Sequence, residues 1–204
     1  MREIQLRLRR SRGDQGVTLV EMLISMTIFA VVLAITYSIL ITIQLQTRDE
    51  TARADSVGDA RIALQQIDRQ VRSGNVLYNP ANETALGFPM SMRIYTQANG
   101  EQRCVQWQVF NGTLRSRSWS PTWQTDGLVS DWGVVAHNVV NTGSEQPFAL
   151  QGGATAFGSR LVDIGLKVKS PQSDGKPIDV TSSLSGRNTA YGYDPGVCSP
   201  IPAA

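Results

Sequence analysis

Apolar side chains dominate residues 22–43, which contain no charge, whereas the residues that follow mix apolar and polar positions. A helix of that length rises about 33 Å at 1.5 Å per residue, enough to cross a hydrocarbon core of roughly 30 Å. The segment therefore predicts a transmembrane helix.

The helical pattern continues beyond the apolar segment, over residues 44–72. Its apolar positions are spaced three and four residues apart and share one face. They are Val57, Ala60, Leu64, Ile67 and Val71. Gly74 is a typical C-terminal stop. One helix is expected from about residue 17 to about residue 73, apolar all round in its first half and amphipathic in its second.

The residues after the helix alternate in the manner of β-strands. Residues 103–110 and 113–119 flank Asn111-Gly112, a two-residue turn typical of hairpins. Further strands are expected at 91–95, 133–140, 160–169 and 178–185, and the tail after Gly186 is expected to be irregular. The sequence thus predicts an α+β protein, with one antiparallel sheet of four to six strands packed on the second half of the helix.

The positive charge of the chain is concentrated in residues 1–16. That segment holds five Arg against one Asp and one Glu, a net charge of 5 − 2 = +3, so the remaining residues carry 2 − 3 = −1. By the positive-inside rule, the N-terminal segment faces the cytoplasm and the bulk of the chain lies outside. The basic excess therefore does not indicate a nucleic-acid-binding domain.

A cleaved secretory signal and a plain signal anchor are simpler interpretations of the apolar segment. A secretory signal has a shorter apolar region with a small-residue cleavage site close behind it, and the only Ala-x-Ala string here is at residues 52–54. A plain anchor explains the segment but not Glu21, because a carboxylate at bilayer depth costs roughly 2.5–3.5 kcal/mol. Either Glu21 snorkels to the interface, or it has a partner such as a free amino terminus at Val17.

Residues 10–24 (RSRGDQGVTLVEMLI) resemble the type IV prepilin signal. That signal has a basic leader, a Gly before the cut, a hydrophobic residue after it, often Thr-Leu next, and Glu in the fifth mature place. The resemblance implies that a prepilin peptidase cleaves between Gly16 and Val17 and N-methylates Val17. It also implies that Glu21 pairs with the amino terminus of a neighbouring filament subunit. Val17 departs from the usual Phe or Met.

The resemblance further implies the pilin fold, a long N-terminal α-helix packed on an antiparallel β-sheet. The chain would then comprise a removed leader (1–16), a membrane-spanning and filament-core helix (17–43), an amphipathic continuation of that helix (44–73) and a globular β domain with an irregular tail (74–204). Within the class, the end of the helix over residues 59–72 is similar to minor pilins and J-like pseudopilins.

These features lead to a structural subunit of a type IV pilus or a type II secretion-like filament, not an enzyme. Its partners would be prepilin peptidase, other pilins or pseudopilins, a membrane assembly platform and, before assembly, the lipid bilayer of the cytoplasmic membrane. It would then move to an extracellular or cell-envelope filament. His137 with Ser130 and Asp131 suggests a hydrolase triad, but no nucleophile motif such as Gly-x-Ser-x-Gly is present.

Cys104 and Cys198 both follow the apolar segment, on the exported side, where thiols are free to oxidise. A disulfide between them is favoured over two unpaired buried thiols. Two thiols and one distant histidine fit no zinc motif, and the two Asp of loop 172–179 are too few for calcium. Neither a metal nor a cofactor is expected.

The alternative function is a tip module of a competence or adhesion pilus that contacts DNA or a surface. Arg115, Arg117 and Trp119 share one face of a predicted strand, which is expected to be partly solvated, and interleaved arginines and aromatics suit single-stranded nucleic acid. The plainer interpretation is an aromatic–arginine stack on a sheet. The charge of −1 outside the leader argues against strong affinity for DNA.

Overall fold

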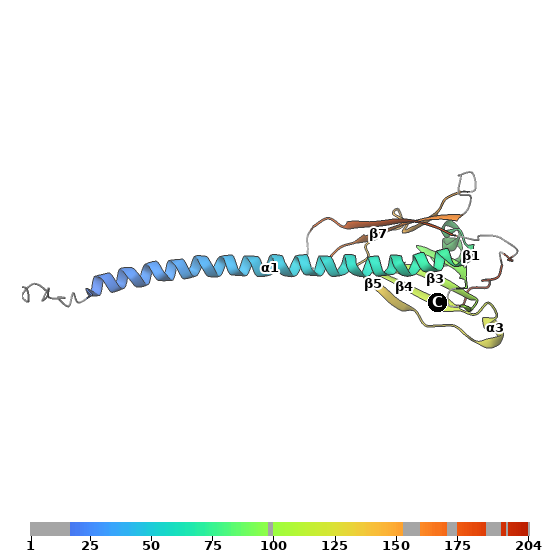
Figure 1. Cartoon of the computed structure of the whole chain (residues 1–204), viewed down its shortest axis with the longest axis horizontal. Coiled ribbons are helices and arrows are strands. Elements are labelled where there is room, and N and C mark those ends of the chain that lie inside the picture. The colour runs from blue at the N-terminus through green and yellow to red at the C-terminus, as the bar shows by residue number, and fades with distance from the viewer. Residues whose placement is uncertain are drawn as a thin grey trace, which may run out of the picture. The chain divides into compact units, whose positions relative to one another are not determined.

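The computed structural model describes residues 17–97, 100–152, 160–170, 175–186, 193–194 and 196–203. The chain divides into two compact units, Met1–Thr47 and Arg48–Ala204. One helix, α1 (Leu19–Arg72), contributes to both units (Figure 1). Its bounds lie within two residues of the predicted 17–73, so the long helix is confirmed.

The second unit adds short helices and eight strands to the end of α1. In chain order these are β1 (Gly74–Leu77), α2 (Pro80–Glu83), the 3-10 helix η1 (Thr84–Leu86), β2 (Ser91–Thr96), β3 (Arg103–Phe110), β4 (Thr113–Trp119), α3 (Trp123–Asp126), β5 (Gly133–His137), β6 (Phe148–Leu150), β7 (Leu161–Val168) and β8 (Ile178–Ser185). Every strand pair is antiparallel. The α+β layout with a long helix on antiparallel sheet is that of a pilin-like protein.

The strands form two sheets, whereas a single sheet was predicted. Sheet A has the order β1-β2-β3-β4-β5, and sheet B has the order β6-β7-β8. Between them, a β-bridge joins Val139 to Val168. Alternation along a strand specifies which face is buried but not which sheet the strand joins, so the prediction of one sheet was wrong for a physical reason.

The predicted hairpin is confirmed residue for residue by β3 and β4. Cys104 pairs with Trp119 at one end of the ladder and Phe110 with Thr113 at the other. The turn residues Asn111 and Gly112 both have positive φ, 46° and 75°, which is the conformation that a two-residue hairpin of this kind requires.

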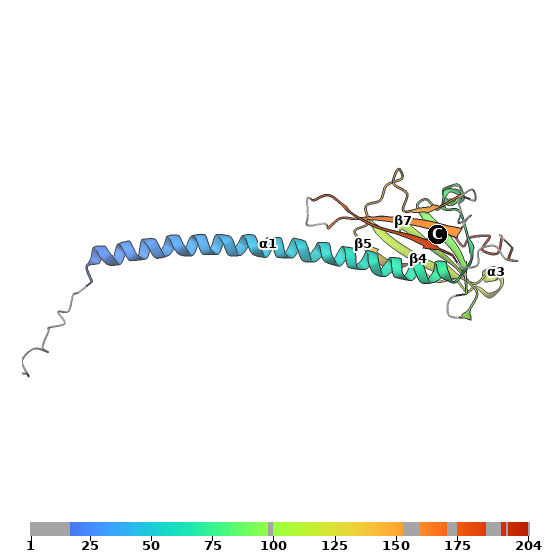
Figure 2. The same cartoon turned by 45° about the horizontal axis from the view of Figure 1, so that its top comes forward.

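Both sheets bury their apolar faces against the second half of α1 (Figures 1 and 2). The buried helix positions are Ser56, Ala60, Ala63, Ile67 and Val71. Val57 and Leu64, which the pattern placed on the buried face, are partly buried and pack against this core. Trp107 is fully buried beside the helix, and its Nε1–H donates to Gln70 Oε1 at 2.6 Å.

The backbone is closely packed where the helix ends and the chain enters β1. A Cβ on Gly74 would lie 3.0 Å from both Ile94 Cγ2 and the Val71 carbonyl oxygen. Gly74 is therefore both the expected helix stop and a close backbone contact. The strand that follows immediately, β1, was not predicted from the sequence.

Candidate processing and assembly site

The first turn of α1 is capped by the residue that precedes it. Thr18 Oγ1 accepts a hydrogen bond from the backbone N–H of Glu21 at 3.2 Å, and the Thr18 carbonyl accepts from Met22 N–H at 3.1 Å. Thr18 is thus the N-cap and Glu21 the third helical residue, the positions of a Ser/Thr-x-x-Glu capping box. This capping arrangement was not predicted from the sequence, although the spacing of three residues from Thr18 to Glu21 carries the signal.

Glu21 also lies in the first turn of the helix, where a negative charge is favoured by the partial positive charge of the helix N-terminus. Its side chain is exposed, as are Val17 and the apolar residues that follow. Residues 1–16, including Gly16, lie outside the described residues. Among the described residues, no cation forms a salt bridge with the Glu21 carboxylate.

The apolar part of α1 leaves its side chains unburied within the chain. No residue of its most apolar 18-residue window is buried, and the helix is long and apolar enough to cross a membrane. Its threonine hydroxyls do not need outside partners, because they donate to backbone carbonyls one turn earlier: Thr27 to Ile24, Thr36 to Val32 and Thr42 to Ser38. Such internal bonding suits a segment surrounded by lipid or by other apolar helices.

In the second unit, the face of sheet A opposite α1 is covered by the C-terminal tail. Cys104 of β3 and Cys198 of the tail form the disulfide that the sequence favoured, with their Cα atoms 5.6 Å apart. Both are buried in a second small core with Tyr95 and Trp119. We call the face of sheet A opposite α1, on which this small core lies, the outer face of sheet A.

A buried ion pair on the outer face was not foreseen from the sequence. Arg93 of β2 donates from Nε to both carboxylate oxygens of Glu83 at 2.9 Å, and from Nη1 to the Cys198 carbonyl at 3.1 Å. Burial raises the pKa of Glu83, and the positive charge of Arg93 opposes that shift. The spacing of ten residues across a loop gave no periodic signal that the pair would meet.

The structure brings Arg115, Arg117 and Trp119 together on the outer face, as alternation predicted. Arg117 and Trp119 are only 4% and 1% exposed, whereas Arg115 is half-buried, so the face that was expected to be partly solvated is open only at Arg115 among these three residues. Arg117 donates to the carbonyl oxygens of Pro202 and Ala203 at 2.9 and 2.8 Å and to Gln106 Oε1 at 3.0 Å. The tail that the disulfide holds is what buries them.

The residues that suggested a hydrolase do not assemble into one. His137 is the last residue of β5, paired with Thr113, and the strand from Gly133 to His137 alone spans about 13 Å. The Ser130 hydroxyl accepts from Ser118 N–H at 2.8 Å and donates to the Asp131 carbonyl at 3.1 Å. Within the described residues, no group of three His, Cys, Asp or Glu is placed to hold a metal ion.

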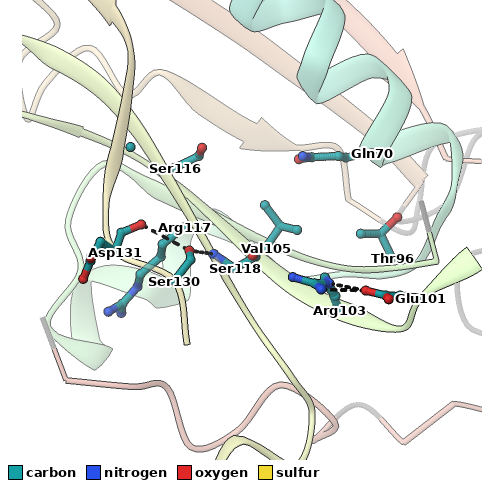
Figure 3. A pocket seen from close by; sticks show the side chains of 11 residues that line it. Gln70, Thr96, Glu101, Arg103, Val105, Ser116, Arg117, Ser118, Ser130 and Asp131 are labelled. Carbon is teal, nitrogen blue, oxygen red and sulfur yellow. Dashed lines mark hydrogen bonds and ion pairs between the residues drawn. The ribbon is translucent and has the colours of Figure 1, made fainter. Parts of the chain in front are cut away.

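A pocket of about 460 Å³ opens beside the last turns of α1 (Figure 3). Its lining includes Gln70 of α1, Ser116 and Ser118 of β4, and the Arg103–Glu101 ion pair, in which Nη2 lies 2.6 Å from Oε2. These groups are hydroxyls, an amide and an exposed arginine–glutamate pair that already forms a salt bridge.

The fold and the N-terminal segment together define a pilin-like protein with an apolar helix suited to membrane anchoring. Residues 11–37 match the family described as the prokaryotic N-terminal methylation motif, and this match supports a type IV prepilin-like protein. The motif implies processing by a peptidase and assembly with other pilins, and it points to a structural role. A search of curated proteins gives no significant match.

Proposed function

We propose that the chain is a minor subunit, a minor pilin or a pseudopilin, of a type IV pilus or a type II secretion-like filament. The observation that carries the proposal is the match over residues 11–37 at the start of an apolar helix whose side chains have no cover within the chain. Such a helix needs lipid before assembly and other apolar helices afterwards. A sheet domain of 131 residues after the helix, 204 − 73, favours a minor subunit over a small major pilin.

In this proposal the leader, residues 1–16, is removed in the cytoplasm by a prepilin peptidase that cuts between Gly16 and Val17. The absence of a side chain at Gly16 lets the backbone approach the catalytic groups of the peptidase. The same enzyme then methylates the new amino terminus at Val17. Residues 17–43 anchor the subunit in the cytoplasmic membrane, and residues 44–73 join that anchor to the exported domain, residues 74–204.

Assembly follows from the charge that Glu21 places at the edge of the apolar segment. The carboxylate would pair with the α-amino group of a neighbouring subunit's Val17, so that the two opposite charges compensate each other in a dry environment. A subunit in the wrong register would leave both charges unpaired, at a cost of several kcal/mol. The pair therefore favours one axial register as an assembly platform in the membrane extracts subunits from the bilayer.

The test is mass spectrometry of the N-terminus of the protein from the membrane fraction and from sheared filaments of the cell that makes it. The expected product begins at Val17 and carries an N-methyl group in both fractions. A protein that begins at Met1 in both fractions would overturn processing. A correctly processed protein that never enters the filament fraction would overturn its role as a subunit.

A further inference from the structure

Arg115 of β4 places its guanidinium group over two aromatic rings on the outer face of sheet A. Its Cζ lies 4.1 Å from the centroid of Phe110 and 4.2 Å from that of Trp132. Gln108 Oε1 accepts from Nε at 3.2 Å and from Nη2 at 2.7 Å. Two rings and the Gln108 amide oxygen therefore contact the guanidinium, and the edge that carries Nη1 has no hydrogen-bond partner among the described residues.

This fixed orientation matters because flexible arginines lose rotamer freedom when they bind. Two rings and one amide already set the plane of the Arg115 guanidinium and its rotation, so a ligand that meets the Nη1 edge orders little more. The planar fork of donors matches a carboxylate better than it matches a single carbonyl oxygen.

In the part of the chain that the structure describes, no acid forms an ion pair with this positive charge. Arg117, the next residue on the same face, hydrogen-bonds only to neutral oxygens, and its Cζ lies 4.5 Å from the same Trp132 ring. Burial and, second, the charge of Arg115 lower the pKa of Arg117 to about 10. Within the described residues, no carboxylate forms a salt bridge with either arginine.

The surroundings of Arg115 are apolar and partly open. Phe110 is 43% exposed, and Val134, the partner of Arg115 in the β4–β5 ladder, is 50% exposed. Arginine and tryptophan are enriched among the residues that supply most of the binding energy at protein–protein interfaces. The site therefore combines a positive charge that can bind an anion with exposed apolar surface on which an apolar side chain can pack.

We propose that Arg115, framed by Phe110, Trp132 and Val134, is a docking site for an acidic side chain of another protein. The partner's Asp or Glu carboxylate meets the free edge of the guanidinium, and an adjacent apolar side chain packs on Phe110 and Val134. A neighbouring filament subunit is the natural source of such a segment, and only this choice of partner rests on the proposed function.

A nucleic acid fits this site less well than an acidic protein segment does. Single-stranded nucleic acid needs open aromatic faces and several cations along its backbone. Trp119 is 1% exposed, Arg117 is 4% exposed, and Trp132 already lies beside both guanidinium groups. The chain beyond residue 16 carries a net charge of 2 − 3 = −1, which gives no field to attract phosphates.

The experiment observes the arginine Nε–Hε resonances of the full-length protein in detergent micelles by NMR. The probes are two peptides, N-acetyl-Leu-Glu-Leu-amide and the same peptide with Gln in place of Glu. We expect the Arg115 resonance to shift and saturate with the Glu peptide, and the Gln peptide to bind about tenfold more weakly or worse, since a hydrogen bond to a charged group is lost. Equal responses to the two peptides, or no response, would overturn the proposal.

Variants then assign the binding to the arginine. Arg115→Gln should abolish binding of the Glu peptide and Arg115→Lys should weaken it at least about tenfold, because an ammonium group cannot form the two parallel bonds. Arg72→Gln changes the net charge equally and should bind as the wild type does. If Arg115→Gln does not fold, the two-peptide comparison on the wild type still decides.

Two further outcomes are informative. One distinguishes a protein ligand from a nucleic acid, and the other distinguishes the docking site from the proposed filament role. Tighter binding of oligothymidylate than of the Glu peptide at the Arg115 resonance would replace the protein partner with a nucleic acid and overturn the inference. A protein that retains its leader in the cell but binds the Glu peptide would leave the docking site standing without the filament role.

Discussion

The guanidinium of Arg93 and the carboxylate of Glu83 form an ion pair inside the second unit, with side chains only 4% and 1% exposed. Arg93 also donates to the Cys198 carbonyl and lies 4.3 Å from the ring centroid of Tyr78. One buried side chain therefore ties β2, the helix α2 and the C-terminal tail together. The covered outer face of sheet A depends on this pair as well as on the disulfide.

Removing one member of this pair should be costly. Glu83→Ala leaves the charge of Arg93 buried without a counter-ion, and we expect the free energy of unfolding to fall by about 3–5 kcal/mol. The measurement is urea denaturation followed by tryptophan fluorescence. Glu101→Gln, which breaks the exposed pair with Arg103, is the matched control and should change stability very little. A double variant, Glu83→Leu with Arg93→Met, should be more stable than Glu83→Ala, and a double variant that is less stable would contradict this account.

The disulfide closes a loop between residues 94 positions apart, so it restricts the unfolded chain strongly. Cys198→Ser should lower the free energy of unfolding by about 2–5 kcal/mol, measured by denaturation in the absence of reductant. Cys104→Ser with Cys198→Ser should cost little more than the single change. Added dithiothreitol should destabilise the wild type but not the double variant, and an equal effect on both would exclude the disulfide as the cause.

Processing should depend on the absence of a side chain at Gly16. Gly16→Leu is expected to leave the full-length precursor in the membrane fraction, because the side chain obstructs close approach of the backbone to the peptidase. Immunoblotting with an antibody to the exported domain measures the two forms. Gly13→Leu, three residues earlier in the leader, is the control and should be cut normally. A mature-sized band from Gly16→Leu would show that the cut lies elsewhere.

Glu21 occupies the Glu position of a capping box and carries the charge of the proposed pairing between subunits. Glu21→Gln preserves the capping box, since glutamine also serves at this position, but it removes the negative charge. We expect this variant to be processed and to accumulate in the membrane while it fails to enter filaments, as measured by its ratio between sheared and cell-bound fractions. Glu50→Gln, an exposed acid farther along α1, should assemble normally. Normal assembly of Glu21→Gln would limit Glu21 to the cap.

Much of the local structure could be predicted because each signal was contained in a few neighbouring residues. The Asn111-Gly112 turn specified the β3–β4 hairpin, and the apolar stripe specified that α1 continues into the second unit. The division into sheets A and B could not be predicted, because alternation identifies a buried face without naming the partner strand. The short strands β1 and β6 escaped notice because four and three residues are too few to establish a period.

The sequence by itself determined the N-terminal part of this protein: an uncharged helix, a basic segment before it and one carboxylate at its start. Those features depend on local composition and on the need of an apolar segment for lipid or for other apolar helices around it. Only the tertiary structure decided the fate of Arg93, Arg115 and Arg117, which are all charged residues on strands. Arg93 gained a buried acid, Arg117 gained the carbonyls of the tail, and Arg115 kept an open edge. The environment of a charge is set by residues far away in sequence, which no local pattern records.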